Sequence, residues 1–269
     1  MKVFDLRIRD VSRYIWYKME YQPEQHMDRS RLLSFLRKEL TIIENQFQDY
    51  LRRQYMNSTS YLNKAVGLIR DMAFDGHALP QQIEYDKNNT SVLSFNYTTP
   101  FKYENNIIDA GNVVNIHGNL DDKIIFGVDG KDCMDDPDAL PFTKTYRVAS
   151  MGVDMCGVLY GIVENGIGQS DTDSIKFFGH SLSEADYSYF QSIFDGINLY
   201  GGHTKLVFYY RPWKGKDEEE LHTETINAVT RLLTTYGRTL DNKDHGKNLM
   251  HKLLLEGRLE VKNLQHRAW

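Results

Sequence analysis

Cysteine is scarce in this sequence of 269 residues, which contains only Cys133 and Cys156. These two lack the CxxC spacing and the nearby histidines of zinc sites, and they cannot build a disulfide framework. We therefore expect no metal site. Free thiols suit a reducing compartment, so the expected location is cytoplasmic.

Long apolar runs are also missing. No stretch approaches the roughly 18 apolar residues of a transmembrane helix. The beginning of the chain carries charges at Lys2, Asp5, Arg7, Arg9 and Asp10 where a signal peptide would have its apolar core. We expect no membrane insertion.

Positive charge is not concentrated in any segment. The 32 Lys and Arg residues against 37 Asp and Glu residues give a formal net charge of −5, and the pI is about 6.0. A dense basic run interleaved with aromatic residues, which would follow a phosphate backbone, is absent from the sequence. Nucleic acid is therefore a poor candidate for a partner.

The apolar content of 41% is enough to fill a substantial core. The length suits one α/β domain with helical insertions. We predict a single domain over residues 1–269, with a helical segment at about 1–89 and a sheet-bearing part at about 90–269.

Apolar residues recur at three- and four-residue spacing in several segments, which predicts amphipathic helices. The longest such segment runs from Ser30 to Tyr55, where Leu33, Leu36 and Leu40 begin an apolar stripe. Residues 244–269 predict one further helix and a strand at Arg258–Val261. The remaining predicted helices are Tyr61–Phe74, Lys144–Val163, Ser183–Leu199 and Asp217–Tyr236.

Short apolar runs that end in small or polar residues predict buried strands. From Ile175 onward, predicted strands alternate with helices, the order that builds parallel sheets. The predicted fold class is α/β. The strands are predicted at Val92–Phe95, Val113–Ile116, Ile124–Phe126, Ile175–Phe178 and Lys205–Tyr210.

Three polar segments directly follow predicted strands, where ligands of open parallel sheets bind. Ser94–Pro100 carries an amide and several hydroxyls, and Asn115–Gly118 carries an imidazole followed by glycine. In Gly179–Asp186 the strand breaks at glycine, and Ser183 and Asp186 have the spacing of a capping box. The free N–H groups of such a turn can face an anion.

Each segment also has a purely structural interpretation. Asn96 could be a turn residue, His117 a structural histidine, and Ser183 and Asp186 helix caps. Their joint occurrence at strand ends favours one nucleotide site.

The stretches at 94–99, 115–118, 125–127 and 178–186 read SFNYTT, NIHG, IFG and FGHSLSEAD. Together they resemble the AbiH family of phage abortive-infection proteins, which is itself similar to the sirtuin-like NAD-consuming domains of bacterial defence. The resemblance covers about residues 35–210. It implies a Rossmann-like, sirtuin-like parallel sheet flanked by helices.

The resemblance also implies an activity, cleavage of NAD+ to nicotinamide and ADP-ribose, with NAD+ as substrate and no metal. Asn96 and His117 would be the catalytic residues. His117 would act as the base, since histidine titrates near neutral pH, and Asn96 would hold the attacking water or the ribose hydroxyls. The implied cofactor-binding residues are Ser94, Thr98, Thr99, Gly118, Gly179, His180, Ser181, Leu182 and Asp186.

The chain departs from the sirtuin pattern in three ways. Thr98 stands where sirtuins carry an aspartate, and the zinc-binding cysteines of the classical deacylases are absent, which argues against protein deacylation. A glycine-rich strand–loop–helix does not precede the first long helix. Such a segment could lie upstream, a partner could supply it, or the cofactor site could be incomplete.

Two alternative functions remain open at this point. One is a subunit of a defence complex that binds or senses a nucleotide without cleaving it. The other is a hydrolase of a different phosphorylated substrate, with His180 and Asp186 as its acid–base pair.

Restraint of activity is a further expectation, because an NAD+ hydrolase that acts without control would deplete its host. We expect a partner subunit, a homo-oligomer or an activating nucleotide to complete the site. Tyr50, Tyr55 and Tyr61, in and after the first long helix, could form such an interface, where tyrosine is enriched.

Overall fold

The computed structural model describes residues 29–56, 58–74, 90–100, 113–130, 133–151, 172–213 and 215–264. The chain divides into two compact units, Met1–Phe47 and Gln48–Trp269. In the first unit the structure describes only residues 29–47, which form the beginning of one long helix. All of the predicted site residues lie in the second unit.

The two helices predicted in the first third of the chain are confirmed as α2 (Arg29–Met56) and α3 (Thr59–Ala73). The buried face of α2 differs from the predicted apolar stripe. Ile43, which continues that stripe, is 52% exposed, whereas the neighbouring Glu44 is 4% exposed.

The described strands form two sheets in which every pairing is parallel. One sheet pairs β1 (Val92–Ser94) with β2 (Val113–Asn115). The other has the order β3 (Ser174–Phe178), β4 (Lys205–Tyr210), β5 (Leu259–Asn263). The α/β class predicted from the sequence is confirmed.

The later helices agree with the predicted pattern. The described part of the predicted helix Lys144–Val163 ends at Met151, and the rest of that prediction lies outside the described residues. Two short 3-10 turns, η3 and η4, precede α4 and α6. The bounds are η3 (Leu140–Phe142), α4 (Lys144–Met151), η4 (Glu184–Asp186), α6 (Tyr187–Gly196), α7 (Glu218–Gly237) and α8 (Lys243–Leu255).

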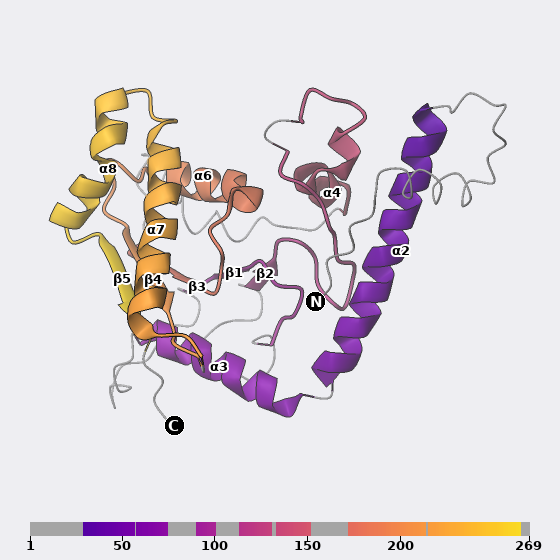
Figure 1. Cartoon of the computed structure of the whole chain (residues 1–269), viewed down its shortest axis with the longest axis horizontal. Coiled ribbons are helices and arrows are strands. Elements are labelled where there is room, and N and C mark those ends of the chain that lie inside the picture. The colour runs from indigo at the N-terminus through magenta and orange to yellow at the C-terminus, as the bar shows by residue number, and fades with distance from the viewer. Residues whose placement is uncertain are drawn as a thin grey trace. The chain divides into compact units, whose positions relative to one another are not determined.

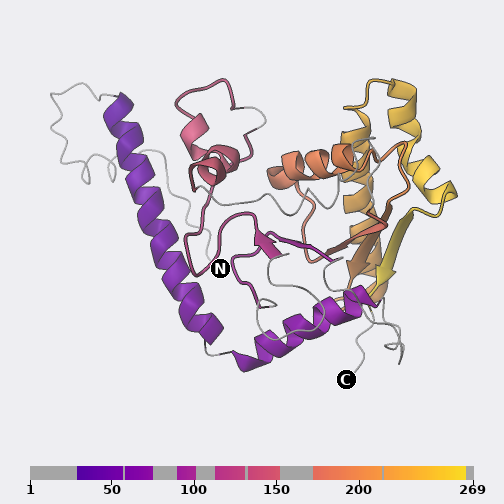
Figure 2. The same ribbon diagram turned by 180° about the vertical axis from the view of Figure 1, so that it is seen from behind.

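Strand β4 separates two apolar layers, because successive side chains of a strand point to opposite faces. Leu206 and Phe208 pack into the core built by α6, α7 and α8, whereas Val207 and Tyr209 pack with side chains of α3. Figures 1 and 2 show the C-terminal end of α3 reaching the sheet on the side away from α7 and α8. Helices therefore cover both faces of the three-stranded sheet.

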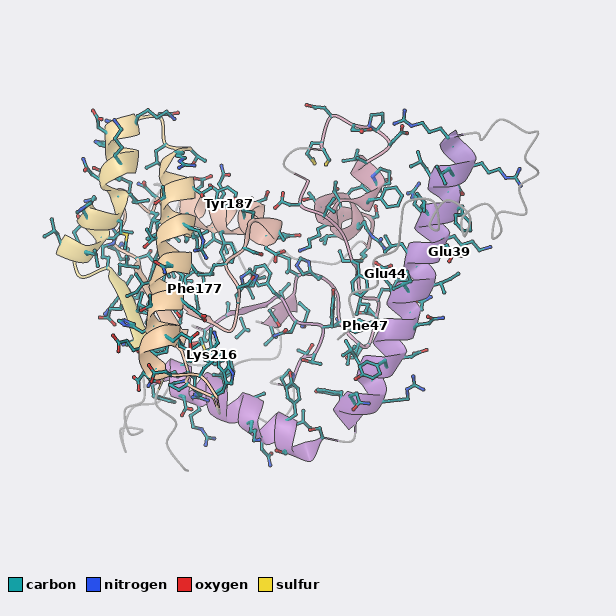
Figure 3. All side chains as sticks on the ribbon, viewed as in Figure 1. Glu39, Glu44, Phe47, Phe177, Tyr187 and Lys216 are labelled. Carbon is teal, nitrogen blue, oxygen red and sulfur yellow. The ribbon has the colours of Figure 1, made fainter. Side chains whose placement is uncertain are left out.

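The larger core lies between this sheet and α6 to α8. Phe177 of β3 and Tyr187 at the start of α6 both belong to this region and are labelled in Figure 3. Phe177 stacks on Phe208 with ring centroids 4.4 Å apart. Phe177 also contacts Phe190 of α6, with ring centroids 6.1 Å apart, and this contact packs the beginning of α6 against β3.

Helices α7 and α8 approach each other closely at two glycines. A Cβ atom on Gly246 would lie 2.0 Å from the carbonyl oxygen of Gly237, and a Cβ on Gly237 would lie 2.4 Å from that of Gly246. Neither position has room for a side chain.

The strand predicted at Ile124–Phe126 was wrong. Gly118 has a φ of +83°, and the chain turns back there so that Ile124 makes one isolated antiparallel bridge to Gly118. The N–H of Ile125 donates to the carbonyl oxygen of His117 at 2.9 Å. Ile124 and Ile125 are buried as predicted, but they lie in a loop that is hydrogen-bonded to the backbone of His117.

None of the helices in the described ranges has the length and apolar content needed to cross a bilayer.

Candidate functional site

The carboxylate of Asp186 is the centre of the candidate site. His117, which follows β2, places Nε2 3.1 Å from Oδ1, and His180, which follows β3, places Nε2 3.2 Å from Oδ2. Lys144, the first residue of α4, donates from Nζ to Oδ1 at 2.5 Å and to the carbonyl oxygen of Ala185 at 3.2 Å. Two of the predicted strand-end segments therefore meet at one carboxylate.

The capping role considered for Ser183 and Asp186 was wrong, since neither side chain caps its helix. Burial would raise the pKa of the Asp186 carboxyl. The hydrogen bonds of His117, His180 and Lys144, with the charge of Lys144, outweigh burial and hold that pKa well below its usual range. Asp186 is therefore ionised at neutral pH and acts as an acceptor only.

The hydrogen bonds of His180 determine its tautomer. The N–H of Leu182 donates to Nδ1 at 2.9 Å, so the proton of the neutral ring lies on Nε2, which donates to Asp186. Leu182 adopts a φ of +53° to make this contact. Both ring nitrogens of His180 are therefore engaged.

His117 differs from His180 in this respect. Because the Asp186 carboxylate only accepts, Nε2 of His117 donates to it, and Nδ1 of the neutral ring carries a lone pair. Nδ1 is buried and has no hydrogen-bond partner among the described residues, while the side chain as a whole is 5% exposed. The site thus contains one oriented imidazole with one unused acceptor.

Glycine is favoured at the predicted positions Gly118 and Gly179 for different structural reasons. At Gly118 a Cβ would lie 1.9 Å from the carbonyl oxygen of Lys123, so the turn after His117 requires glycine. Gly179 has a φ of +71°, and a Cβ there would meet nothing within 4 Å. Its backbone conformation alone favours glycine, and both Gly179 and Ser181 are exposed.

The loop that follows β1 is organised by Asn115, at the end of β2. Its buried amide donates to the carbonyl oxygens of Asn96 at 2.7 Å and Thr98 at 3.1 Å. It also accepts from Oγ1 of Thr99 at 2.7 Å. Ser94 contributes its Oγ, which accepts from the N–H of Asn96 at 3.2 Å.

The side chains of this loop do not join the Asp186 cluster directly. Asn96 is exposed, and within the described ranges its side chain makes no hydrogen bond. Thr98 shares a hydrogen bond of 2.7 Å with the hydroxyl of Tyr61. The link to the cluster is Phe95, whose ring centroid lies 4.4 Å from that of His180 and 5.7 Å from that of His117.

Sequence reasoning missed three residues of this region: Lys144, Asn115 in its structural role, and Tyr189. Tyr189 lies on the first turn of α6, with its ring centroid 5.7 Å from that of His117. The available signal was its position only three residues after the end of the Gly179–Asp186 segment. Nothing in the sequence around Lys144 indicates its contact with a carboxylate 42 residues away.

Helix α2 fixes the loop after His117 from another side. Nε2 of Gln48 lies within 3.2 Å of the carbonyl oxygens of Asn119, Leu120 and Asp122. Nε of Arg52 donates to the oxygen of Leu120 at 2.7 Å. Both side chains belong to the second unit.

Across the described ranges, no group of three or more His, Cys, Asp or Glu side chains is arranged to hold a metal ion. The positive charge beside Asp186 comes instead from the ammonium group of Lys144.

A family model described as "Bacteriophage abortive infection AbiH" matches residues 3–210. This range includes the Asp186 cluster, α6 and β4. Comparisons with curated proteins and with solved structures find no match.

Proposed function

Because the chain belongs to the bacteriophage abortive infection family AbiH, we propose that it serves phage defence as an NAD+ glycohydrolase. The reaction would convert NAD+ and water to nicotinamide, ADP-ribose and a proton. The observation that carries this proposal is Nδ1 of His117, which is buried and has no hydrogen-bond partner in the described part of the chain, on a ring held by Asp186.

The chemistry needs few groups. The bond between the ribose C1′ and the nicotinamide nitrogen breaks, its electron pair leaves with nicotinamide, and the ribose acquires oxocarbenium character. Water adds to C1′, and His117 accepts the proton of that water on Nδ1. The ionised Asp186 stabilises the resulting imidazolium, the role that an aspartate has in hydrolase triads.

The remaining predicted residues would bind and orient the substrate. The exposed amide of Asn96, on a loop fixed by Asn115, is available to the ribose hydroxyls. The exposed turn from Gly179 to Ser181 precedes α6, and the N-terminus of that helix favours the negative charge of phosphates. In this proposal NAD+ lies across the C-terminal ends of the parallel strands, in a Rossmann-like, sirtuin-like arrangement.

The alternative of an acid–base pair formed by His180 and Asp186 is less well supported. His180 receives the N–H of Leu182 on Nδ1 and donates from Nε2 to Asp186, so it has no free nitrogen for a substrate. A subunit that senses a nucleotide without cleaving it would use the same loops. An activity assay therefore has to distinguish this function from that of an enzyme.

The test is nicotinamide release by the wild-type chain and by His117→Gln. Glutamine retains an N–H donor for Asp186 but has no basic nitrogen, so we expect turnover to fall by about 10²- to 10⁴-fold with little change in Tm. His251→Gln, at an exposed position of α8, is the matched control and should keep wild-type turnover.

Two outcomes would count against the proposal. Wild-type turnover in His117→Gln removes this histidine from the mechanism. Calorimetric binding of NAD+ to the wild-type chain without any nicotinamide release, under every activating condition tried, favours the sensing subunit.

A further inference from the structure

The hydroxyl of Tyr189 is a buried polar atom that the proposed mechanism does not use. It is inaccessible to solvent and has no hydrogen-bond partner among the described residues. Its ring makes edge contacts with His117 and with Phe95, whose centroid is 5.9 Å away. Tyr189 therefore belongs to the wall of the candidate site.

An unpaired buried hydroxyl is unfavourable, because folding removes it from water without replacing its hydrogen bonds. The hydroxyl of Tyr236 shows the usual solution in the same core, since it donates to Oδ1 of Asp195 at 2.9 Å. Nδ1 of His117 is unpaired in the same way as the Tyr189 hydroxyl. Two unsatisfied polar atoms thus lie on neighbouring rings.

The two atoms differ in hydrogen-bonding character. Burial, with the negative charges of Asp186 and Asp129, raises the pKa of Tyr189 to about 12, so this hydroxyl stays protonated and can donate. Nδ1 of His117 can only accept while the ring is neutral and Nε2 donates to Asp186. A single group that satisfies both must accept one hydrogen bond and donate another, which is the property of a hydroxyl or a water molecule.

We propose that the Tyr189 hydroxyl and Nδ1 of His117 together bind one O–H group of the reactants, either the attacking water or a ribose hydroxyl. The inference rests on the proposed NAD+ glycohydrolase function and adds Tyr189 to that site. Tyr189 donates to the oxygen and His117 accepts its hydrogen, which directs the proton toward the base.

The experiment compares Tyr189→Phe with the matched control Tyr236→Phe in the full-length chain. Thermal unfolding, nicotinamide release from NAD+ and calorimetric binding of ADP-ribose are measured for each. Tyr189→Phe should keep or raise the Tm, because it removes a hydroxyl that has no partner, and should lower turnover by about 10- to 100-fold. Tyr236→Phe should lower the Tm, because Asp195 loses a donor, and should keep wild-type turnover.

The calorimetric measurement identifies the source of the O–H group. Weaker binding of ADP-ribose by Tyr189→Phe assigns it to a ribose hydroxyl, whereas unchanged affinity with a lower kcat assigns it to the water. Wild-type turnover in Tyr189→Phe overturns the inference. A loss of Tm as large as that of Tyr236→Phe also overturns it, because the hydroxyl would then have a structural partner.

Failure of the proposed function gives a different result. If the wild-type chain binds ADP-ribose but releases no nicotinamide under any of the activating conditions, the enzyme proposal fails. The inference is then tested by the calorimetric affinity for ADP-ribose. Weaker binding by Tyr189→Phe than by the wild type supports it, and equal binding by the two overturns it. A chain that neither binds nor cleaves overturns both.

Discussion

The carboxylate of Asp186 accepts hydrogen bonds from two histidines and one lysine, so its charge links the site to the stability of the fold. These contacts hold the pKa of Asp186 below its ordinary value of 3.8. A carboxyl with a lowered pKa stabilises the folded state above its unfolded pKa, and that stabilisation is lost as the pH falls through the folded pKa.

We therefore predict that Asp186→Asn lowers the Tm at pH 7, and that the difference from the wild type shrinks as the pH falls from about 5 to 2. Calorimetric melting at several pH values measures this. Asp244→Asn, at an exposed side chain of α8, controls for the loss of one charge and should show a smaller effect at every pH. A difference that stays constant down to pH 2 would contradict the assigned role of Asp186.

Several site residues could be predicted from the sequence, because each follows a predicted strand. His117, Gly179, His180 and Asp186 were found in this way. Most of their contacts were not predictable: the spacing of Asp186 indicated a helix cap, and two of its three partners, His117 and Lys144, come from distant segments. Lys144 was missed because a lysine at the start of a helix carries no local sign of a buried partner.

At the scale of elements, the contact between α7 and α8 depends on two glycines. We predict that Gly246→Ala destabilises the fold by about 1–3 kcal/mol, because the added methyl group would overlap the backbone of Gly237. For a chain of this size the Tm should fall by several degrees, on the order of 2–4 °C per kcal/mol.

Gly67→Ala is the matched control for this prediction. Gly67 lies within α3, and a Cβ there would meet nothing within 4 Å. Alanine has the higher helix propensity, by about 1 kcal/mol, so this variant should keep or raise the Tm. Equal Tm changes in the two variants would mean that the helices can separate at low cost.

Helices and most strands could be predicted because their periodicity reflects which face is buried. The described helices agree with the predicted ones to within a few residues, as α7 (Glu218–Gly237) does with Asp217–Tyr236. The strand at Ile124–Phe126 failed because a short apolar run is compatible with any buried conformation. The reversal at Gly118 and the contact of Ile125 with His117 are tertiary features that the run itself does not encode.

At the scale of the whole molecule, we predict that the purified chain alone is a weak or inactive NADase and that activity appears with a partner protein, with self-association or with an activating nucleotide. The physical reason is the need for restraint in a host that depends on NAD+. Light scattering and nicotinamide release, measured on the same sample, test this. A fully active monomer without partner or activator would contradict it.

The sequence separation within the site has a consequence for biosynthesis. His117 and Asp186 are 69 residues apart in the chain, and ribosomes add roughly 5–20 residues per second. During synthesis, His117 therefore exists for about 3–14 s before its carboxylate partner is added. Nascent and prematurely terminated chains that end before Asp186 lack the carboxylate that holds His117, so the candidate site cannot form until translation has passed residue 186.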